Sequence, residues 1–281
     1  MKRNTMRRLT IWGQYLAGLL LAILFLLPLY WVFVASLRQP GLPPPTTISW
    51  WPLQANWGNY REIFRIVPMS RYIKNSLIVA GAAVPLTLLT ASLAGFSMSQ
   101  MPDKPRRRLL AASVALLIVP ASSVWMFRFQ ILRLMGLIDS LWALIIPAFA
   151  ASSPLFVLLF YWTFRRLSGE MIEAARLDGA SAWTIWRRLA FPLARPTAVA
   201  VTILTFIMYW NDFVSPVLYI YRPKLYTAPI GLQILNQVDS TNWPLHMAAA
   251  ALMTLPIIIL LILLQRYFLS DLSLANVGDG S

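Results

Sequence analysis

Six long stretches of the sequence carry almost no charged side chain, and they constrain the fold more than any other feature. A helix that crosses a bilayer needs about 20 apolar residues, because the hydrocarbon interior offers no water to its backbone polar groups. The stretches predict helices over about residues 11–37, 75–101, 109–129, 140–164, 196–221 and 243–265. The chain is therefore expected to be an all-α integral membrane protein with six transmembrane helices.

Composition supports this prediction and removes several kinds of chemistry. Hydrophobic residues make up 58% of the chain and charged residues only 12%, whereas a soluble domain carries about 25% charged residues. The chain has no cysteine and one histidine, which excludes disulfides, thiolate metal sites, cysteine nucleophiles and a His-rich metal centre. The first apolar stretch is longer than the core of a secretory signal, which is about 7–15 residues, so we treat it as a true span.

The distribution of basic residues predicts the orientation of the chain. With the N-terminus inside, 15 of the 24 Lys and Arg residues fall on the cytoplasmic side, as the positive-inside rule favours. Both termini are then cytoplasmic, at residues 1–10 and 268–281. Residues 38–74 form an outer loop, and residues 165–195 form a cytoplasmic loop. The net charge of +14 fits contact with anionic lipid, and no nucleic-acid-binding motif accompanies it.

The cytoplasmic loop has the pattern of two short helices joined by a glycine. Glu170 and Glu173 fall in a first helical turn, where carboxylates complement the helix dipole. Gly179 stands where a left-handed residue would end that helix, Ser181 can cap a second one, and Pro192 is expected to limit it. Such a short, partly apolar element outside the membrane has little core of its own, and we expect it to dock on another protein.

The motifs of this loop resemble those of one family. The loop resembles the EAA loop of bacterial ABC-importer permeases in Glu173-Ala174-Ala175, Gly179 and Leu189-Ala190-Phe191-Pro192. The run Asp178-Gly179-Ala180 is similar to the one found in the carbohydrate branch of that family, which is typified by the smaller maltose permease subunit. Trp210-Asn211-Asp212-Phe213 and Ala228-Pro229-Ile230-Gly231-Leu232 extend the resemblance along the chain.

The resemblance implies a type I ABC-importer permease (MetI-like) fold in the bacterial plasma membrane, with a core over residues 75–267. It implies three protein partners: a cytoplasmic ABC ATPase dimer, a second permease subunit of a different sequence, and an extracytoplasmic sugar-binding protein. The chain lacks a nucleotide-binding G-x-x-x-x-G-K-[ST] loop, so ATP and Mg²⁺ are expected on the ATPase and no cofactor on this chain. The residues expected to couple to the ATPase are Glu173, Ala174, Ala175, Asp178, Gly179, Ala180, Trp183, Trp186 and Pro192.

Two further groups of residues are candidates for binding. Asp212 is the one acid inside a predicted span, where a charge costs about 2.5–3.5 kcal/mol. With Tyr209, Asn211 and Ser215 it could hydrogen-bond a sugar, or it could hold the fifth span against its neighbours. The outer stretch 222–242 offers Gly231, Gln233, Asn236 and Gln237 to a binding protein, or it is an ordinary solvated loop. The resemblance assigns no function to Arg128.

Two other functions fit a multi-span chain less well. An ion-coupled secondary transporter would use several intramembrane carboxylates or an inverted repeat, and the sequence shows one such acid and no convincing repeat. An intramembrane enzyme would need convergent catalytic groups, and one histidine with one buried acid supplies few.

Overall fold

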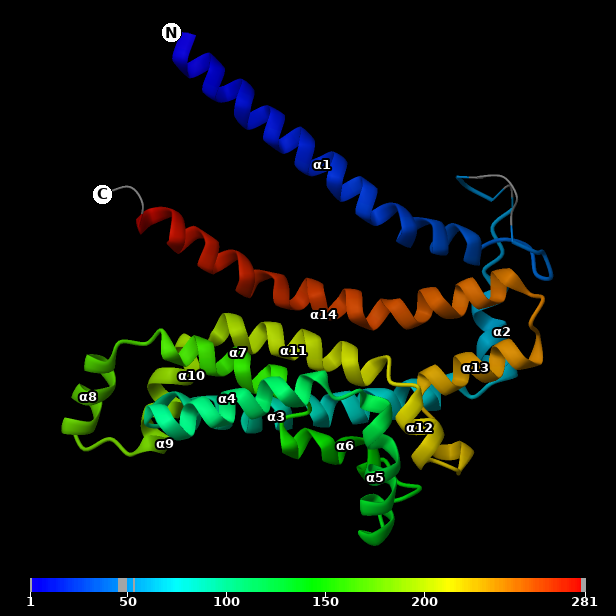
Figure 1. Cartoon of the computed structure of the whole chain (residues 1–281). Helices are drawn as coiled ribbons and strands as arrows, with labels where there is room; N and C mark the ends of the chain where they lie inside the picture. Colours follow the sequence, from blue (N-terminus) through cyan, green and yellow to red (C-terminus); the bar gives the residue numbers. More distant parts are fainter. Residues whose placement is uncertain (1, 45–49, 53, 279–281) are drawn as a thin grey trace. The chain divides into compact units, whose positions relative to one another are not determined.

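The computed structural model describes residues 2–44, 50–52 and 54–278, apart from the side chains of residues 2–11, 121 and 268–278 (Figure 1). Within these residues every regular element is a helix, which confirms the all-α prediction. Four helical segments are long and apolar enough to cross a membrane: 12–36, 69–100, 142–165 and 243–267. Two bent helix pairs, 103–118 with 122–134 and 182–193 with 195–210, raise the number of candidate spans to as many as six.

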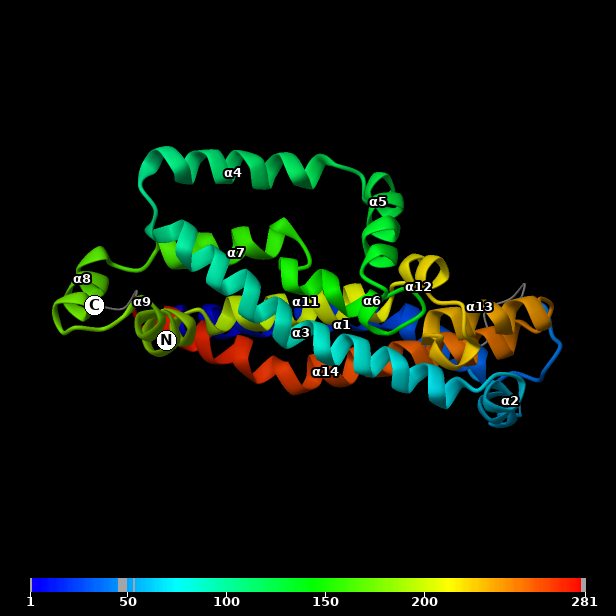
Figure 2. The same cartoon turned by 90° about the horizontal axis from the view of Figure 1, so that it is seen from below.

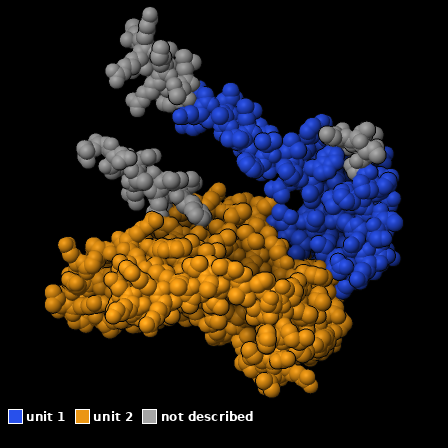
Figure 3. Space-filling view, viewed as in Figure 1, with its two compact units in different colours: residues 1–69, 232–255 blue, residues 70–231, 256–281 orange. Residues whose placement is uncertain are grey.

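The chain divides into two compact units, drawn in two colours in Figure 3. Unit 1 comprises residues 1–69 and 232–255. It holds α1 (Lys2–Ser36), α2 (Gly58–Ile66), the end of α13 (Ala228–Val238) and the start of α14 (Trp243–Gly278). Apolar side chains of α1 such as Trp12 and Phe25 are exposed, as expected of a helix that meets lipid or another subunit. Pro28 and Pro256 lie inside α1 and α14. Transmembrane helices tolerate such interior prolines.

The predicted outer loop 38–74 is partly helical, which corrects the sequence prediction. It contains α2, and α3 already begins at Met69. The side-chain amide of Asn59 donates hydrogen bonds to the backbone oxygens of Ser36 (2.7 Å) and Arg38 (2.8 Å). These bonds satisfy carbonyls at the end of α1 that have no partner within the helix. Buried Ile63 anchors α2 from its apolar face.

Unit 2 comprises residues 70–231 and 256–281 and contains the cytoplasmic loop 165–195 and residues 209–215. Its first helices are α3 (Met69–Gln100), α4 (Asp103–Ile118), α5 (Ala121–Leu134) and α6 (Trp142–Ile145), followed by the 3₁₀ helix η1 (Ile146–Ala150) and α7 (Pro154–Arg165). One buried cluster joins α3 and α7 to the cytoplasmic loop through Phe96, Phe160 and Trp186. A second joins α3, α5, α6 and the helices near residue 212.

Three of the predicted spans are interrupted. The third becomes α4 and α5, which meet at 102° after Pro120, a residue without a backbone N–H to continue the first helix (Figure 2). The fourth contains a turn at Ala151 and Ser152, whose φ angles are 61° and 58°. The fifth is α11 (Arg195–Trp210), a break at residues 211–213, and α12 (Val214–Tyr219).

Candidate coupling element and cavity

The first half of the cytoplasmic loop is a capped helix. In α8 (Gly169–Leu177) the Ser168 hydroxyl accepts a hydrogen bond from the backbone N–H of Met171 (3.3 Å). After the helix, Gly179 adopts a φ of +81°, a left-handed conformation that glycine reaches without steric cost. Backbone N–H groups of Gly179 and Ala180 then donate to the carbonyls of Arg176 and Ala175, both at 3.0 Å. The predicted glycine cap is confirmed.

The second half is one continuous rod of mixed winding. It consists of α9 (Ala182–Ile185), the π-helical turn η2 (Trp186–Ala190) and α10 (Phe191–Leu193). Ser181 caps it as predicted, because its hydroxyl accepts a hydrogen bond from the backbone N–H of Thr184 (3.2 Å). We refer to residues 168–194 as the coupling element.

Pro192 does not end this rod, which corrects the sequence prediction. It lies inside α10, and the chain bends by 81° between residues 182–193 and α11, at Ala194. An interior proline normally clashes with the carbonyl four residues earlier. Here that residue is Arg188, in the π turn, whose wider winding departs from α-helical geometry.

The two faces of α8 differ sharply in burial. Ile172 is buried and Ala175 is partly buried against the core of unit 2, whereas Glu173, Ala174 and Leu177 are exposed along the opposite face. The Leu177 side chain is 89% exposed. Sequence reasoning missed Leu177, although an apolar residue four positions after Glu173 lies on the same side of a helix. Asp178 and Gly179 are exposed beside this face, and Ala180 is partly buried.

The two tryptophans of the element have different environments. Trp186 is 6% exposed and packs in the core, with its ring centroid 5.4 Å from that of Phe191. Trp183 is 52% exposed, and its ring lies 4.7 Å from that of Trp186. The prediction that both rings pack on a partner is therefore wrong for Trp186, which the chain's own core covers.

A hydrogen bond and a shared cluster fix the coupling element to the helices of unit 2. The guanidinium of Arg176 donates to the side-chain oxygen of Gln100, at the end of α3 (3.0 Å). Ile185 is buried in the same cluster as Phe96 of α3. A displacement of the element would therefore act directly on α3.

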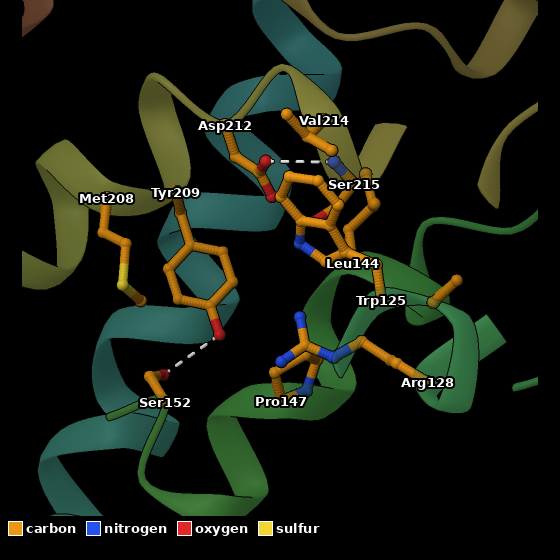
Figure 4. Close-up of a pocket in the computed structure, with 11 residues that line it drawn as sticks. Trp125, Arg128, Leu144, Pro147, Ser152, Met208, Tyr209, Asp212, Val214 and Ser215 are labelled. Carbon is orange, nitrogen blue, oxygen red and sulfur yellow. Dashed lines mark hydrogen bonds between the residues drawn. The ribbon is translucent and has the colours of Figure 1, made fainter. Parts of the chain in front are cut away.

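A cavity of about 300 Å³ lies at the other end of α11 (Figure 4). Side chains of α5, α6, α11 and α12 line it together with residues of the turns between them. The lining residues are Trp125, Arg128, Ala143, Leu144, Pro147, Ser152, Met208, Tyr209, Asp212, Val214 and Ser215.

Three of the four residues predicted to contact substrate line this cavity. They are Tyr209, Asp212 and Ser215, whereas Asn211 is exposed and is not among the lining residues. One carboxylate oxygen of Asp212 accepts a hydrogen bond from the backbone N–H of Ser215 (3.1 Å). Asp212 therefore has a structural task at the start of α12 as well as a place in the cavity.

The structure adds residues that sequence reasoning did not place there. The Ser152 hydroxyl lies 3.0 Å from the hydroxyl of Tyr209 and 2.5 Å from that of Thr87, so three hydroxyls form a chain. Trp125 and Arg128 enter from α5 (Figure 4). The sequence signal for Arg128 was a charged residue at the end of the predicted span 109–129, since charges at membrane depth are costly and usually functional.

The outer stretch 222–242 is mostly helical, which corrects its reading as a loop. It contains the 3₁₀ helix η3 (Pro223–Leu225) and α13. Gln233, Asn236 and Gln237 are exposed on α13, but Gly231 is buried. The prediction that Gly231 offers a contact surface is therefore wrong.

An ion pair holds the start of that stretch. The Asp139 carboxylate accepts hydrogen bonds from the backbone N–H groups of Arg222 (2.9 Å) and Tyr221 (3.0 Å) and from Nε of Arg222 (2.6 Å). These contacts hold the pKa of Asp139 below its ordinary value, and the backbone N–H of Arg222 contributes most. The segment after α12 is thereby fixed to the turn before α6.

Several helices are apolar and long enough to span a membrane, so the fold is that of a multi-pass membrane protein. It carries an exposed helix–glycine–helix element and a cavity lined by helix ends. The sequence matches the family model of the binding-protein-dependent transport system inner membrane component over residues 76–273, and the chain belongs to this family. It is thus a multi-pass inner-membrane permease component of a binding-protein-dependent transport system.

Relatives along almost the whole chain agree with this assignment. The chain is 26% identical to the sulfoquinovosyl glycerol transport system permease protein SmoH of Agrobacterium fabrum, over 92% of this chain and 91% of the relative. It is also 26% identical to the trehalose/maltose permease protein MalG of Thermococcus litoralis, over 97% and 98%. A solved bacterial ABC transporter that imports the acidic polysaccharide alginate has the same fold, with a TM-score of 0.73 at 20% identity, over 93% of this chain and 97% of that one.

Proposed function

We propose that the chain is a permease subunit of an ATP-driven sugar importer and forms half of its translocation pathway. The transport functions of its relatives support a carbohydrate substrate. They include transport of trehalose and maltose, of arabinooligosaccharides, and of melibiose, raffinose and stachyose. These relatives are transport permeases rather than enzymes.

The observation that carries the proposal is the exposed face of α8, formed by Glu173, Ala174 and Leu177. A capped helix outside the candidate spans, with an apolar side chain almost fully exposed, is a surface suited to a protein partner. We propose that this partner is one subunit of a cytoplasmic ABC ATPase dimer, which binds ATP and Mg²⁺. A second permease subunit would supply the other half of the pathway.

The chemistry of the face indicates how the contact would form. Ala174 and Gly179 present almost no side chain and allow close backbone approach. Leu177 would fill an apolar pocket on the ATPase, and Glu173 would pair with one of its Lys or Arg residues. Trp183 is half-exposed on the second helix of the coupling element, and its ring is proposed to add to the contact.

Substitution of Leu177 tests the proposal against a matched control. Leu134, at the end of α5, is also 89% exposed and is not part of the coupling element. Burial of a leucine stabilises a contact by about 1.5–3 kcal/mol, so Leu177→Ser should weaken ATPase binding by about 10- to 100-fold. The measurement is the amount of ATPase that co-purifies with the permease in detergent. Leu134→Ser should retain the wild-type amount, and equal retention in both variants would refute the contact.

We also propose that Gln233, Asn236 and Gln237 on α13, which the positive-inside rule assigns to the outer face of the membrane, contact the sugar-binding protein. All three are exposed, and Gln233 and Gln237 are one helical turn apart. The triple substitution to alanine should leave assembly and basal ATP hydrolysis intact but reduce the stimulation by the binding protein. Unchanged stimulation would argue against this contact.

The cavity formed by Tyr209, Asp212, Ser215 and their neighbours is the proposed substrate path of this subunit. Carboxylate and hydroxyl groups are the hydrogen-bonding partners that sugar hydroxyls need. Asn211 is exposed and does not line the cavity, so it is left out of this proposed path.

A further inference from the structure

Arg128 is a charged side chain of the cavity to which the family resemblance assigns no role. It extends from α5 into the space between Pro147, Tyr209 and Asp212 (Figure 4). Within the described part of the chain, its guanidinium forms no hydrogen bond or ion pair with another residue. The side chain is partly buried where it lines the cavity, and charged side chains in or beside membrane spans usually face a partner or a ligand path.

The cavity's own carboxylate does not fill this role. Asp212 caps α12 through the backbone N–H of Ser215, and it forms no salt bridge with Arg128 in the structure. The hydrogen bond from that N–H offsets part of the negative charge. Arg128 consequently keeps a set of planar N–H donors, which match the two oxygens of a carboxylate.

The position of Arg128 is fixed from outside the cavity. The Tyr219 hydroxyl donates to the backbone oxygen of Trp125 (3.3 Å), one turn before Arg128. The ring of Phe129 lies 6.4 Å from that of Tyr219, and Leu132 is 1% exposed in the core. These contacts hold α5 so that Trp125 and Arg128 face the cavity together.

The remaining walls suit a sugar ring. Trp125 offers an aromatic surface, and the hydroxyls of Tyr209 and Ser152 and the second oxygen of Asp212 offer hydrogen-bonding groups. A volume of about 300 Å³ is at the small end of ligand sites, which range over about 300–1,000 Å³. It therefore suits one sugar unit rather than a long chain.

We propose that this cavity is a subsite for an acidic sugar, in which Arg128 binds the anionic group of the substrate. Trp125 packs against the ring, and Asp212 and Tyr209 bind its hydroxyls. The inference rests on the proposed importer function and narrows its substrate to sugars that carry a carboxylate or an equivalent anion.

The test is binding of glucuronate and of glucose, its neutral counterpart, to the assembled importer in lipid nanodiscs. Saturation-transfer NMR in competition mode measures weak sugar binding without ATP hydrolysis. We expect glucuronate to bind about tenfold more tightly than glucose, because a charge-assisted bidentate contact is added. Arg128→Gln should abolish this preference, and Arg128→Lys should retain part of it because the charge remains.

Arg133→Gln is the matched control, because Arg133 lies on the same helix, is exposed, and does not line the cavity. It should keep the tenfold preference. Asp212→Asn should increase the preference, since it removes the negative charge that opposes an anion.

Three results would overturn the inference. They are equal binding of the two sugars by the wild type, no sugar binding by it, or an unchanged preference in Arg128→Gln. Loss of the second permease subunit from Arg128→Gln, without any sugar preference in the wild type, would mean that Arg128 pairs with that subunit instead. Co-purification of the ATPase in the same preparations tests the importer function separately, so failure of the two proposals can be distinguished.

Discussion

Gly95 in the middle of α3 shows how closely two helices of unit 2 approach. A Cβ atom at this position would lie 2.7 Å from Cβ of Phe160, 2.8 Å from the backbone nitrogen of Tyr161 and 2.9 Å from the carbonyl oxygen of Val157. All three atoms belong to α7, and two of them are backbone atoms that cannot rotate away. Only a residue without a side chain fits this crossing.

We therefore expect Gly95→Ala to destabilise the protein by about 1–3 kcal/mol, the usual cost of overpacking. Gly81→Ala on the same helix is the control, because nothing lies within 4 Å of the Cβ it adds. That variant should be neutral or gain about 0.5–1 kcal/mol, since alanine is the better helix former. Thermal unfolding in detergent measures both, and equal midpoints would contradict the close approach.

At the scale of single residues, the sequence predicts what depends on close neighbours in the chain. The left-handed Gly179 and the cap at Ser181 follow from patterns within a few positions, and both are confirmed. The residues that line the cavity together with Arg128 could not be predicted, because Ser152, Tyr209 and Asp212 lie on other elements, far from Arg128 in the sequence. The same holds for Trp186, whose burial depends on α3 and α7.

Among the elements, the second rod of the coupling element combines an internal anchor with an external contact. Trp186 is buried and Trp183 is half-exposed on the same short rod. Trp186→Ala should cost about 3–5 kcal/mol of stability, as for other buried aromatic truncations. Trp183→Ala should have little effect on thermal unfolding but should lower the amount of ATPase that co-purifies. Equal losses of stability in the two variants would contradict this division of roles.

Element boundaries are less predictable than element existence. Pro85 lies inside unbroken α3, whereas Pro120 precedes a sharp bend. The same residue type thus gives opposite results, because packing decides whether the freed carbonyl finds another partner. The break at 211–213 is marked in the sequence by Asp212, an acid in an apolar run. The structure was needed to show that Asp212 caps α12, because the cap depends on the position of Ser215.

For the whole molecule, the absence of cysteine from the sequence allows its orientation to be tested with single cysteines. We expect Gln237→Cys to react with a membrane-impermeant maleimide in intact spheroplasts, since the basic residues place α13 outside. Ala182→Cys, on the exposed coupling element, should react only after the membrane is permeabilised. The opposite pattern would reverse the predicted topology and remove the ATPase contact.

Family and general function were recoverable from the sequence because their signals are spread along the entire chain. The apolar stretches, the EAA-like loop and the Trp-Asn-Asp-Phe run together indicated an importer permease, and the match over residues 76–273 confirms that family. The count of six spans stays a prediction, since bent helix pairs make the number depend on how each pair meets lipid.

Helix α11 runs without interruption from the bend at Ala194 to Trp210, beside the cavity. Its 16 residues give a rigid rod about 24 Å long. A tilt of about 10° at the cytoplasmic end would move the far end by about 4 Å, more than the length of a hydrogen bond. A small displacement of the coupling element would then be transmitted along α11 and would release a molecule bound in the cavity.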